Sequence, residues 1–111
     1  MSPDGFTVLV GRDAVTNDLL TFRLAAPADF WLHVAGSSGS HVVVRNPDGL
    51  AALPRETLRF AAGLAVRYSS ARNAGRTPVH VARRRDVGKD RRAPDGEVSV
   101  RGGRTVYAGA S

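Results

Sequence analysis

The hydrophobic positions of this chain form short runs that Gly, Pro and polar residues interrupt. Over residues 6–11 the pattern alternates and then becomes apolar, which predicts an opening strand that ends at Gly11. The apolar stretch Trp31–Val34 and the uninterrupted Val42–Val44 predict two buried strands, because β-branched and aromatic side chains pack well on a pleated surface. The first half of the chain therefore indicates a sheet.

Two segments carry signals typical of helices. The first spans about residues 18–25, and Thr16 or Asn17 is expected to cap its first free N–H groups. The second begins near Pro54, which is tolerated in a first helical turn, and stops at Gly75. Ala and Gly are frequent in the second segment, so we expect that helix to lie close against the sheet.

The last third of the chain predicts three more strands. Residues 79–87 alternate at first and project charge at their far end, and a basic loop follows at 88–96. The closing strands are expected over 97–100 and 104–107, with Gly102-Gly103 between them as a hairpin signal. The resulting order, β-α-β-β-α-β-β-β, predicts a single α+β domain over residues 1–111, with a mostly antiparallel sheet of about five strands and two helices.

Length and composition limit the kinds of protein to which this chain can belong. The chain has 111 residues, 42% of them hydrophobic, which suits one core without a metal or partner to support folding. It contains no Cys, and no apolar run approaches the roughly 20 residues that span a bilayer. We therefore expect a soluble cytoplasmic protein with no membrane partner and no cofactor.

Charge is distributed unevenly along the chain. The formal net charge is +6, yet residues 67–111 hold 11 Lys and Arg against 4 acidic residues. A polyanionic partner, above all RNA, is the first interpretation, because guanidinium groups fit phosphate oxygens. The predicted RNA contacts are Arg12, Arg45, Arg83, Arg84, Arg85, Lys89, Arg91 and Arg92. The alternative is a solvated basic edge that keeps the sheet from aggregating.

A Gly/Ser loop lies between the two central strands. Its glycines allow close backbone approach, and its hydroxyls lie near exposed N–H groups, so the loop is a candidate phosphate nest or, alternatively, a plain turn. The candidate residues are Gly36, Ser37, Gly39, Ser40 and His41. Trp31 could stack on a base, but a single Trp within an apolar run is more typical of a core.

The same region offers a second class of function. Asp29, His33 and His41 could ligate a metal, or Ser40, His41 and Asp29 could form a hydrolytic set. The spacing matches no metal motif, and no Gly-x-Ser-x-Gly elbow accompanies the serine. We therefore predict no catalytic residue, no metal and no enzymatic activity, with a small hydrolase or metal enzyme as the alternative.

Several short motifs occur in an order that resembles a known family. They are Asp4-Gly5-Phe6, Val10-Gly11-Arg12, Asn17-Asp18-x-Leu20, Asp29-Phe30-Trp31-Leu32-His33, Gly39-Ser40-His41-Val42-Val43, Tyr68-Ser69 and Pro78-Val79. This order resembles the NFACT-R domain, the RNA-binding module of the RqcH/NEMF ribosome quality-control proteins, whose bacterial members are also called fibronectin-binding protein A-like. The pair Asp-x-Trp-x-His and Gly-Ser-His-Val-Val is its most specific part.

The resemblance implies a role in handling RNA on the translation apparatus. RqcH-type proteins hold tRNA against the large ribosomal subunit and recruit alanyl-tRNA to extend an obstructed nascent chain without a template. The N-terminal NFACT domain and coiled-coil arms of that family are absent from these 111 residues, so this chain alone is not expected to extend peptides. The resemblance implies that the partners are tRNA or rRNA and the large ribosomal subunit. It is compatible with a free-standing domain and with the C-terminal part of a longer protein. A module that docks on a ribosomal protein is a further alternative.

Overall fold

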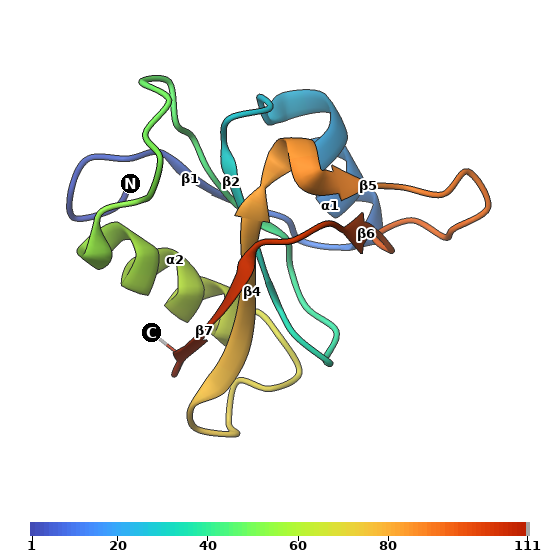
Figure 1. Cartoon of the computed structure of the whole chain (residues 1–111). Helices are drawn as coiled ribbons and strands as arrows, with labels where there is room; N and C mark the ends of the chain where they lie inside the picture. Colours follow the sequence, from blue (N-terminus) through green and yellow to red (C-terminus); the bar gives the residue numbers. More distant parts are fainter. Residues whose placement is uncertain (111) are drawn as a thin grey trace.

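The computed structural model describes residues 1–110 and consists of one central sheet with helices on both faces (Figure 1). The sheet has the strand order β1-β3-β2-β4-β7, and every neighbouring pair is antiparallel. Its strands are β1 (Val8–Val10), β2 (Phe30–Val34), β3 (Val42–Val44), β4 (Thr77–Arg83) and β7 (Arg104–Ala108). The predicted α+β class, with two helices and an antiparallel sheet, is confirmed.

The helix α2 (Arg55–Arg67) covers one face of the sheet. Alternate residues of β2 and β4, among them Leu32 and Val79, point to this face and meet Ala61 and Ala65, which are fully buried. The small side chains let the helix approach the strands closely, as the sequence predicts. Pro54 stands immediately before the helix as its N-cap residue, and the chain leaves the helix at Tyr68.

The first helix begins earlier than predicted. α1 (Ala14–Leu19) continues into a π-helical turn, η1 (Leu20–Leu24), and together they cover the other face of the sheet. The N-cap is Asp13 instead of Thr16 or Asn17. The Asp13 carboxylate accepts a hydrogen bond from the Thr16 N–H (2.8 Å), while the Thr16 hydroxyl accepts one from the Asp13 N–H (2.9 Å). This reciprocal capping box fixes the start of the helix.

The predicted strand over 79–87 is wrong beyond residue 83. After β4 the chain forms a 3₁₀ turn, η2 (Arg84–Asp86), and then β5 (Val87–Gly88), which pairs with β6 (Ser99–Val100) in a separate ribbon. We call residues 84–101 the protruding arm, because the loop beyond β5 and β6 extends away from the body of the domain (Figure 1). The arginines at 83–85 therefore do not lie on one strand.

The predicted hairpin at Gly102-Gly103 is also wrong. Both glycines have positive φ, but β6 pairs with β5 while β7 pairs with β4, so the turn passes the chain from the arm to the main sheet. A Cβ on Gly103 would lie 2.4 Å from the Val81 carbonyl oxygen. The glycine is needed for this close approach rather than for a two-residue hairpin.

No helix among the described residues 1–110 is long and apolar enough to cross a membrane.

Candidate functional site

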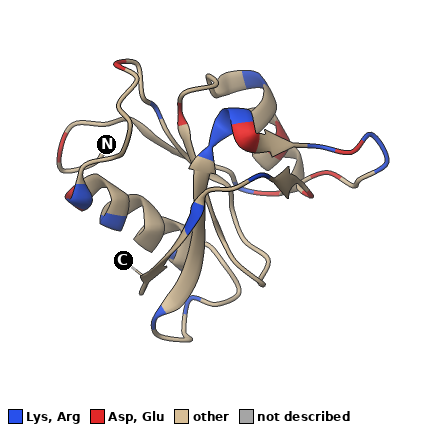
Figure 2. Cartoon of the chain, viewed as in Figure 1, with Lys and Arg blue, Asp and Glu red and all other residues tan. Residues whose placement is uncertain are grey.

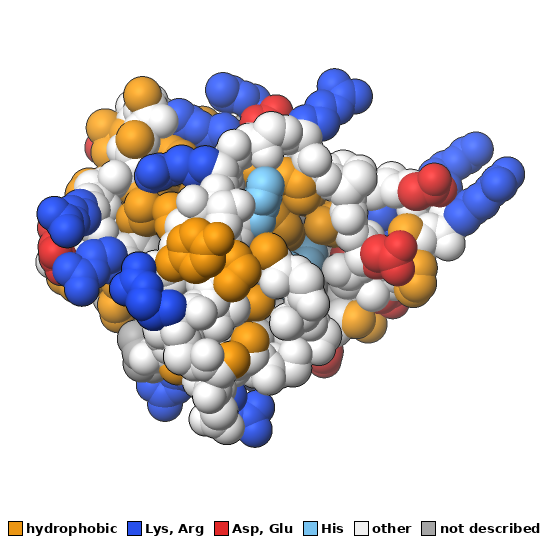
Figure 3. Space-filling view, turned by 60° about the horizontal axis from the view of Figure 1, so that its bottom comes forward, with side chains coloured by type: hydrophobic (Ala, Val, Ile, Leu, Met, Phe, Trp, Pro, Cys, Tyr) orange, Lys and Arg blue, Asp and Glu red, His pale blue; other side chains and the backbone are white. Residues whose placement is uncertain are grey.

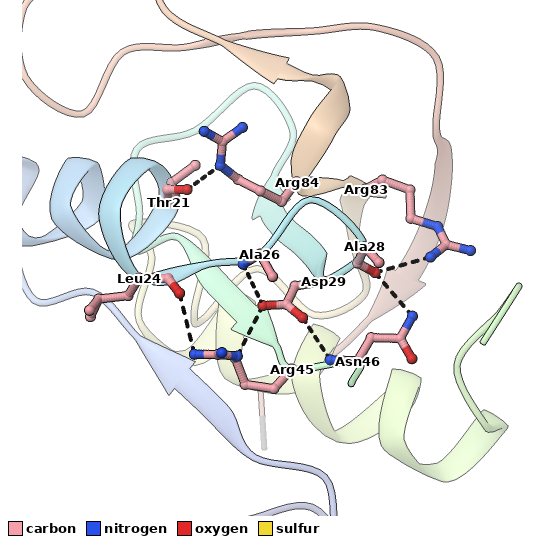
Figure 4. Close-up of polar contacts among 9 residues, drawn as sticks. All are labelled: Thr21, Leu24, Ala26, Ala28, Asp29, Arg45, Asn46, Arg83 and Arg84. Atoms are coloured by element: carbon pink, nitrogen blue, oxygen red, sulfur yellow. Dashed lines mark hydrogen bonds and ion pairs between the residues drawn. The ribbon is translucent and has the colours of Figure 1, made fainter. Parts of the chain in front are cut away.

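Arg83 and Arg84, two of the predicted RNA-contacting cations, bind backbone carbonyls of the domain itself (Figure 4). Arg83 donates to the carbonyls of Ala28, Leu50 and Ala51 at 3.0, 2.8 and 2.9 Å, and its guanidinium lies 4.4 Å from the Phe30 ring centroid. Arg84 donates to the carbonyls of Thr21 and Val87 and lies over the Phe22 ring. Arg83 thus ties the segments before β2 and after β3 to β4, whereas Arg84 ties η2 (Arg84–Asp86) to η1 and to β5.

Arg45 and Lys89 form ion pairs within the domain. Arg45 donates to the buried Asp29 carboxylate at 3.0 Å and to the Leu24 carbonyl at 3.3 Å. Lys89 pairs with Asp18 at 3.0 Å and also donates to the carbonyls of Pro94 and Glu97. The Lys89 contacts hold the two ends of the 89–97 loop together and against α1, where Asp18 lies.

The other four predicted cations, Arg12, Arg85, Arg91 and Arg92, are exposed. No acceptor for their guanidinium groups is found among the described residues. Arg91 and Arg92 lie in the loop of the protruding arm, where Figure 2 shows Lys and Arg together with acidic residues. The structure thus separates the predicted set into cations engaged within the fold and cations offered to solvent.

A groove of about 1150 Å³ opens on the sheet face opposite α2. It is bordered by the loop between β2 and β3, by the turn after α2 and by residues 95–98 of the protruding arm. All five predicted phosphate-loop residues line it, and so does Arg12. Figure 3 shows histidine side chains among hydrophobic and uncharged atoms in a hollow, with Lys and Arg side chains toward the edges of this face.

The floor of the groove gathers every histidine of the chain around its single tryptophan. The Trp31 ring stacks on His33 (centroids 5.8 Å apart) and meets His41 and His80 edge to face at 5.3 and 6.4 Å. His33 and His80 are directly opposite each other on β2 and β4. The pairing of these strands creates the cluster, which spacing along the chain does not reveal.

His41 is buried with both ring nitrogens engaged. Nε2 lies 3.2 Å from the Gly96 carbonyl, which only accepts, so Nε2 carries the proton and Nδ1 accepts from the Thr21 hydroxyl at 2.9 Å. Burial, with a smaller contribution from nearby His33, lowers the pKa of His41 to about 4. Burial also lowers the pKa of His33. Both imidazoles are therefore neutral at physiological pH.

The Gly/Ser loop is held by the turn after α2. The Ser40 N–H donates to the Tyr68 carbonyl at 3.1 Å, and the Ser70 N–H donates to the Ser38 carbonyl at 3.0 Å. The His41 N–H donates to Asn17 Oδ1 at 3.0 Å. The Ser40 and His41 N–H groups are thus already engaged within the fold. Gly36 is exposed, and its φ of 74° is in the left-handed region that favours glycine.

Gly39 is needed because the loop passes close to Ser69. A Cβ at residue 39 would lie 2.7 Å from the Ser69 Cβ, so we expect Gly39→Ala to lower the free energy of unfolding by about 2 kcal/mol through overpacking. Urea unfolding measures this change. The matched control is Gly109→Ala, where nothing lies within 4 Å of the new Cβ, and an equal loss in both variants would contradict the steric argument.

The alternative catalytic or metal set is not assembled. Both Asp29 oxygens are engaged, Oδ1 by the Asn46 N–H (2.7 Å) and Oδ2 by the Ala26 N–H (2.8 Å) and Arg45. His41 is engaged by other partners, so Asp29 neither orients it nor completes a ligand set. No group of three His, Cys, Asp or Glu among residues 1–110 is arranged to hold a metal ion.

Sequence reasoning did not select several residues that line the groove. His80, Arg72 and Glu97 come from β4, the turn after α2 and the protruding arm, which are distant along the chain. The signal that could have found His80 was its alternation with Val79 and Val81, which places it on the face shared by His33 once the strands are paired.

The fold and the surface define a small α+β domain in which exposed arginines flank a groove lined by aromatic rings. Residues 1–102 match the family model described as "NFACT protein RNA binding domain", and the chain belongs to this family. The family resemblance expected from the sequence motifs is confirmed.

Two similar proteins support the same assignment. The chain is 37% identical over 108 residues to "Rqc2 homolog RqcH" of Bacillus subtilis, covering 96% of this chain and 18% of that protein. It is 35% identical over 74 residues to "Ribosome quality control complex subunit NEMF homolog" of Drosophila melanogaster, covering 67% of this chain and 7% of that protein. The chain thus spans less than a fifth of the length of either relative.

A solved structure shares the fold over the whole chain. The C-terminal part of the fibronectin/fibrinogen-binding protein from Streptococcus suis superposes with a TM-score of 0.92 at 29% sequence identity, covering 100% of this chain and 44% of that one.

Proposed function

We propose that this domain binds structured RNA of the translation apparatus, tRNA or rRNA, on the large ribosomal subunit in the cytoplasm, without catalysing a reaction. The observation that carries the proposal is the exposure of arginines on the protruding arm of a chain that belongs to an RNA-binding family. Guanidinium groups that no internal acceptor holds are available to phosphate oxygens.

The arrangement of cations on the arm supports the proposed contact with phosphates. Arg85, Arg91, Arg92 and Arg101 are exposed along it, and its only lysine, Lys89, fastens its base to Asp18. A fastened base orders the loop, so less conformational entropy is lost when its tip contacts a ligand. The acidic residues interspersed on the arm favour contact with defined phosphates over uniform attraction to any polyanion.

A triple variant of the arm tests the proposal. We expect Arg85→Ala, Arg91→Ala and Arg92→Ala together to weaken tRNA binding about thirtyfold at moderate salt and to reduce the salt slope by about 3, because each lost phosphate contact removes about one released counterion. Filter binding at several salt concentrations measures both quantities.

The matched control changes net charge equally at a distance from the arm. Arg55, Arg59 and Arg76 are exposed, the first two on α2 and the third just before β4, and their replacement by Ala should leave affinity within about threefold. Equal losses in the two triple variants would show that net charge alone drives association. Absent or salt-insensitive tRNA binding by the unmodified domain would refute the proposal and favour docking on a ribosomal protein.

A further inference from the structure

The floor of the groove is chemically unlike a phosphate site. Trp31, His33 and His80 present aromatic rings, the His80 Nε2 is engaged by the Gly102 carbonyl at 2.9 Å, and burial lowers the pKa of His33. Among the residues that line the groove, three arginines are balanced by three acidic residues. Aromatic rings set among balanced charges suit the face of a nucleobase better than an oxyanion.

Trp31 supplies an independent sign of a missing partner. Its side chain lines the groove, only 2% of the residue is exposed, and its Nε1–H is the one buried side-chain donor without a hydrogen-bond partner among the described residues. An unsatisfied buried donor carries a free-energy cost that an incoming acceptor would offset. His33 stacks on the Trp31 ring, and His41 and His80 meet that ring edge to face.

The rim and the size of the groove suit a chain of nucleotides. Exposed Arg12 and Arg72 stand at the border, where they can reach phosphates on either side of a base on the floor. A volume of about 1150 Å³ exceeds the roughly 300–1,000 Å³ of pockets that enclose a single small ligand. The opening therefore accommodates a short single strand.

We propose that this groove binds an unpaired RNA segment by stacking a base on His33 and His80, next to the buried Trp31, with the flanking phosphates on Arg12 and Arg72. The inference rests on the proposed RNA-binding function and adds a second contact surface to it. The protruding arm binds the backbone of folded RNA, and the groove selects an unpaired base beside it.

Trp31 fluorescence tests the inference directly, because it is the only tryptophan. Titration with tetra-adenylate should quench Trp31 emission to saturation, and a tetramer of the same backbone with abasic sugars should bind at least about tenfold more weakly, since stacking provides much of the affinity of single strands. Equal binding of the two tetramers would overturn the inference, because phosphate contacts alone would then explain it.

Variants separate the two surfaces. His33→Ala should weaken tetra-adenylate binding about tenfold, His33→Phe should restore most of it through stacking, and Thr105→Ala, outside the groove on β7, should change nothing. The arm triple variant should bind tRNA about thirtyfold more weakly and should bind the tetramer as the unmodified domain does. If the domain binds tRNA but the tetramer does not quench Trp31, the groove proposal alone is overturned, and a polypeptide becomes the next occupant to test. If the unmodified domain binds neither RNA, the proposed function itself is refuted.

Discussion

We expect Asp29→Ala to lower the free energy of unfolding by about 4 kcal/mol, the largest effect of any single change considered for this domain. Asp29 is 2% exposed, and its carboxylate accepts from the Ala26 and Asn46 N–H groups as well as from Arg45. The substitution leaves those two backbone donors without an acceptor. Arg45 adds less, because its side chain is 42% exposed and water partly replaces the lost carboxylate.

The carboxylate also organises a wider polar cluster. The Asn46 side chain and Arg83 both donate to the Ala28 carbonyl at 3.0 Å (Figure 4). Both also donate to the Leu50 carbonyl, at 3.0 and 2.8 Å. Loss of Asp29 therefore loosens the corner that orients Arg83. Arg83 and Arg84 both donate to backbone carbonyls of the domain, so their replacement by Ala would alter stability as well as RNA binding. The arm variant therefore omits both.

Urea unfolding followed by Trp31 fluorescence measures the Asp29→Ala effect. The control is Asp48→Ala, because Asp48 is exposed in the turn after β3 and should change stability by less than about 0.5 kcal/mol. A loss below about 1 kcal/mol for Asp29→Ala would mean that the two backbone donors find new acceptors, which would contradict the buried network.

The elements that local pattern governs could be predicted from the sequence. The runs Trp31–Val34 and Val42–Val44 form β2 and β3 because their β-branched and aromatic residues are buried on both faces of a covered sheet. Ala61 and Ala65 lie under the sheet because helical spacing puts them on one face. In these segments propensity, periodicity and tertiary packing agree.

What failed depends on partners distant in the chain. Arg83 bonds to Leu50, which is 33 residues away, and nothing in an Arg-Arg-Arg run distinguishes a side chain that caps carbonyls from one that points to solvent. The Gly102-Gly103 pair has the composition of a hairpin, but the pairing of β6 with β5 overrides it. The histidine cluster likewise needs the register of β2 against β4, which periodicity alone does not set.

The second large effect concerns pH. His41 has a pKa of about 4 in the folded domain, below its ordinary value of about 6.5, because burial disfavours the imidazolium. The unfolded chain then binds a proton at higher pH than the folded one. We expect the free energy of unfolding to keep its full value above pH 6.5 and to fall as the pH decreases from about 6.5 to about 4. The total decrease caused by this residue should be on the order of 3 kcal/mol.

Burial is the largest cause of the lowered pKa of His41, and three neighbouring titratable groups modify it. His33 on β2 and Lys89 in the protruding arm oppose a positive imidazole, whereas Asp18 on α1 favours it. The ion pair between Lys89 and Asp18 keeps these two groups close together. Burial also lowers the pKa of His33, so protonation of His33 adds to the loss of stability over an overlapping pH range.

The contribution of His41 is isolated by comparison with His41→Gln, whose amide can donate to the Gly96 carbonyl but does not titrate. The wild-type domain should lose more stability than this variant between pH 6.5 and 4, and NMR titration of the His41 ring should show a pKa well below 6.5 in the folded state. Parallel stability profiles, or an ordinary His41 pKa, would show that the ring is not held neutral between Thr21 and Gly96, and the groove floor would then carry positive charge at mildly acidic pH.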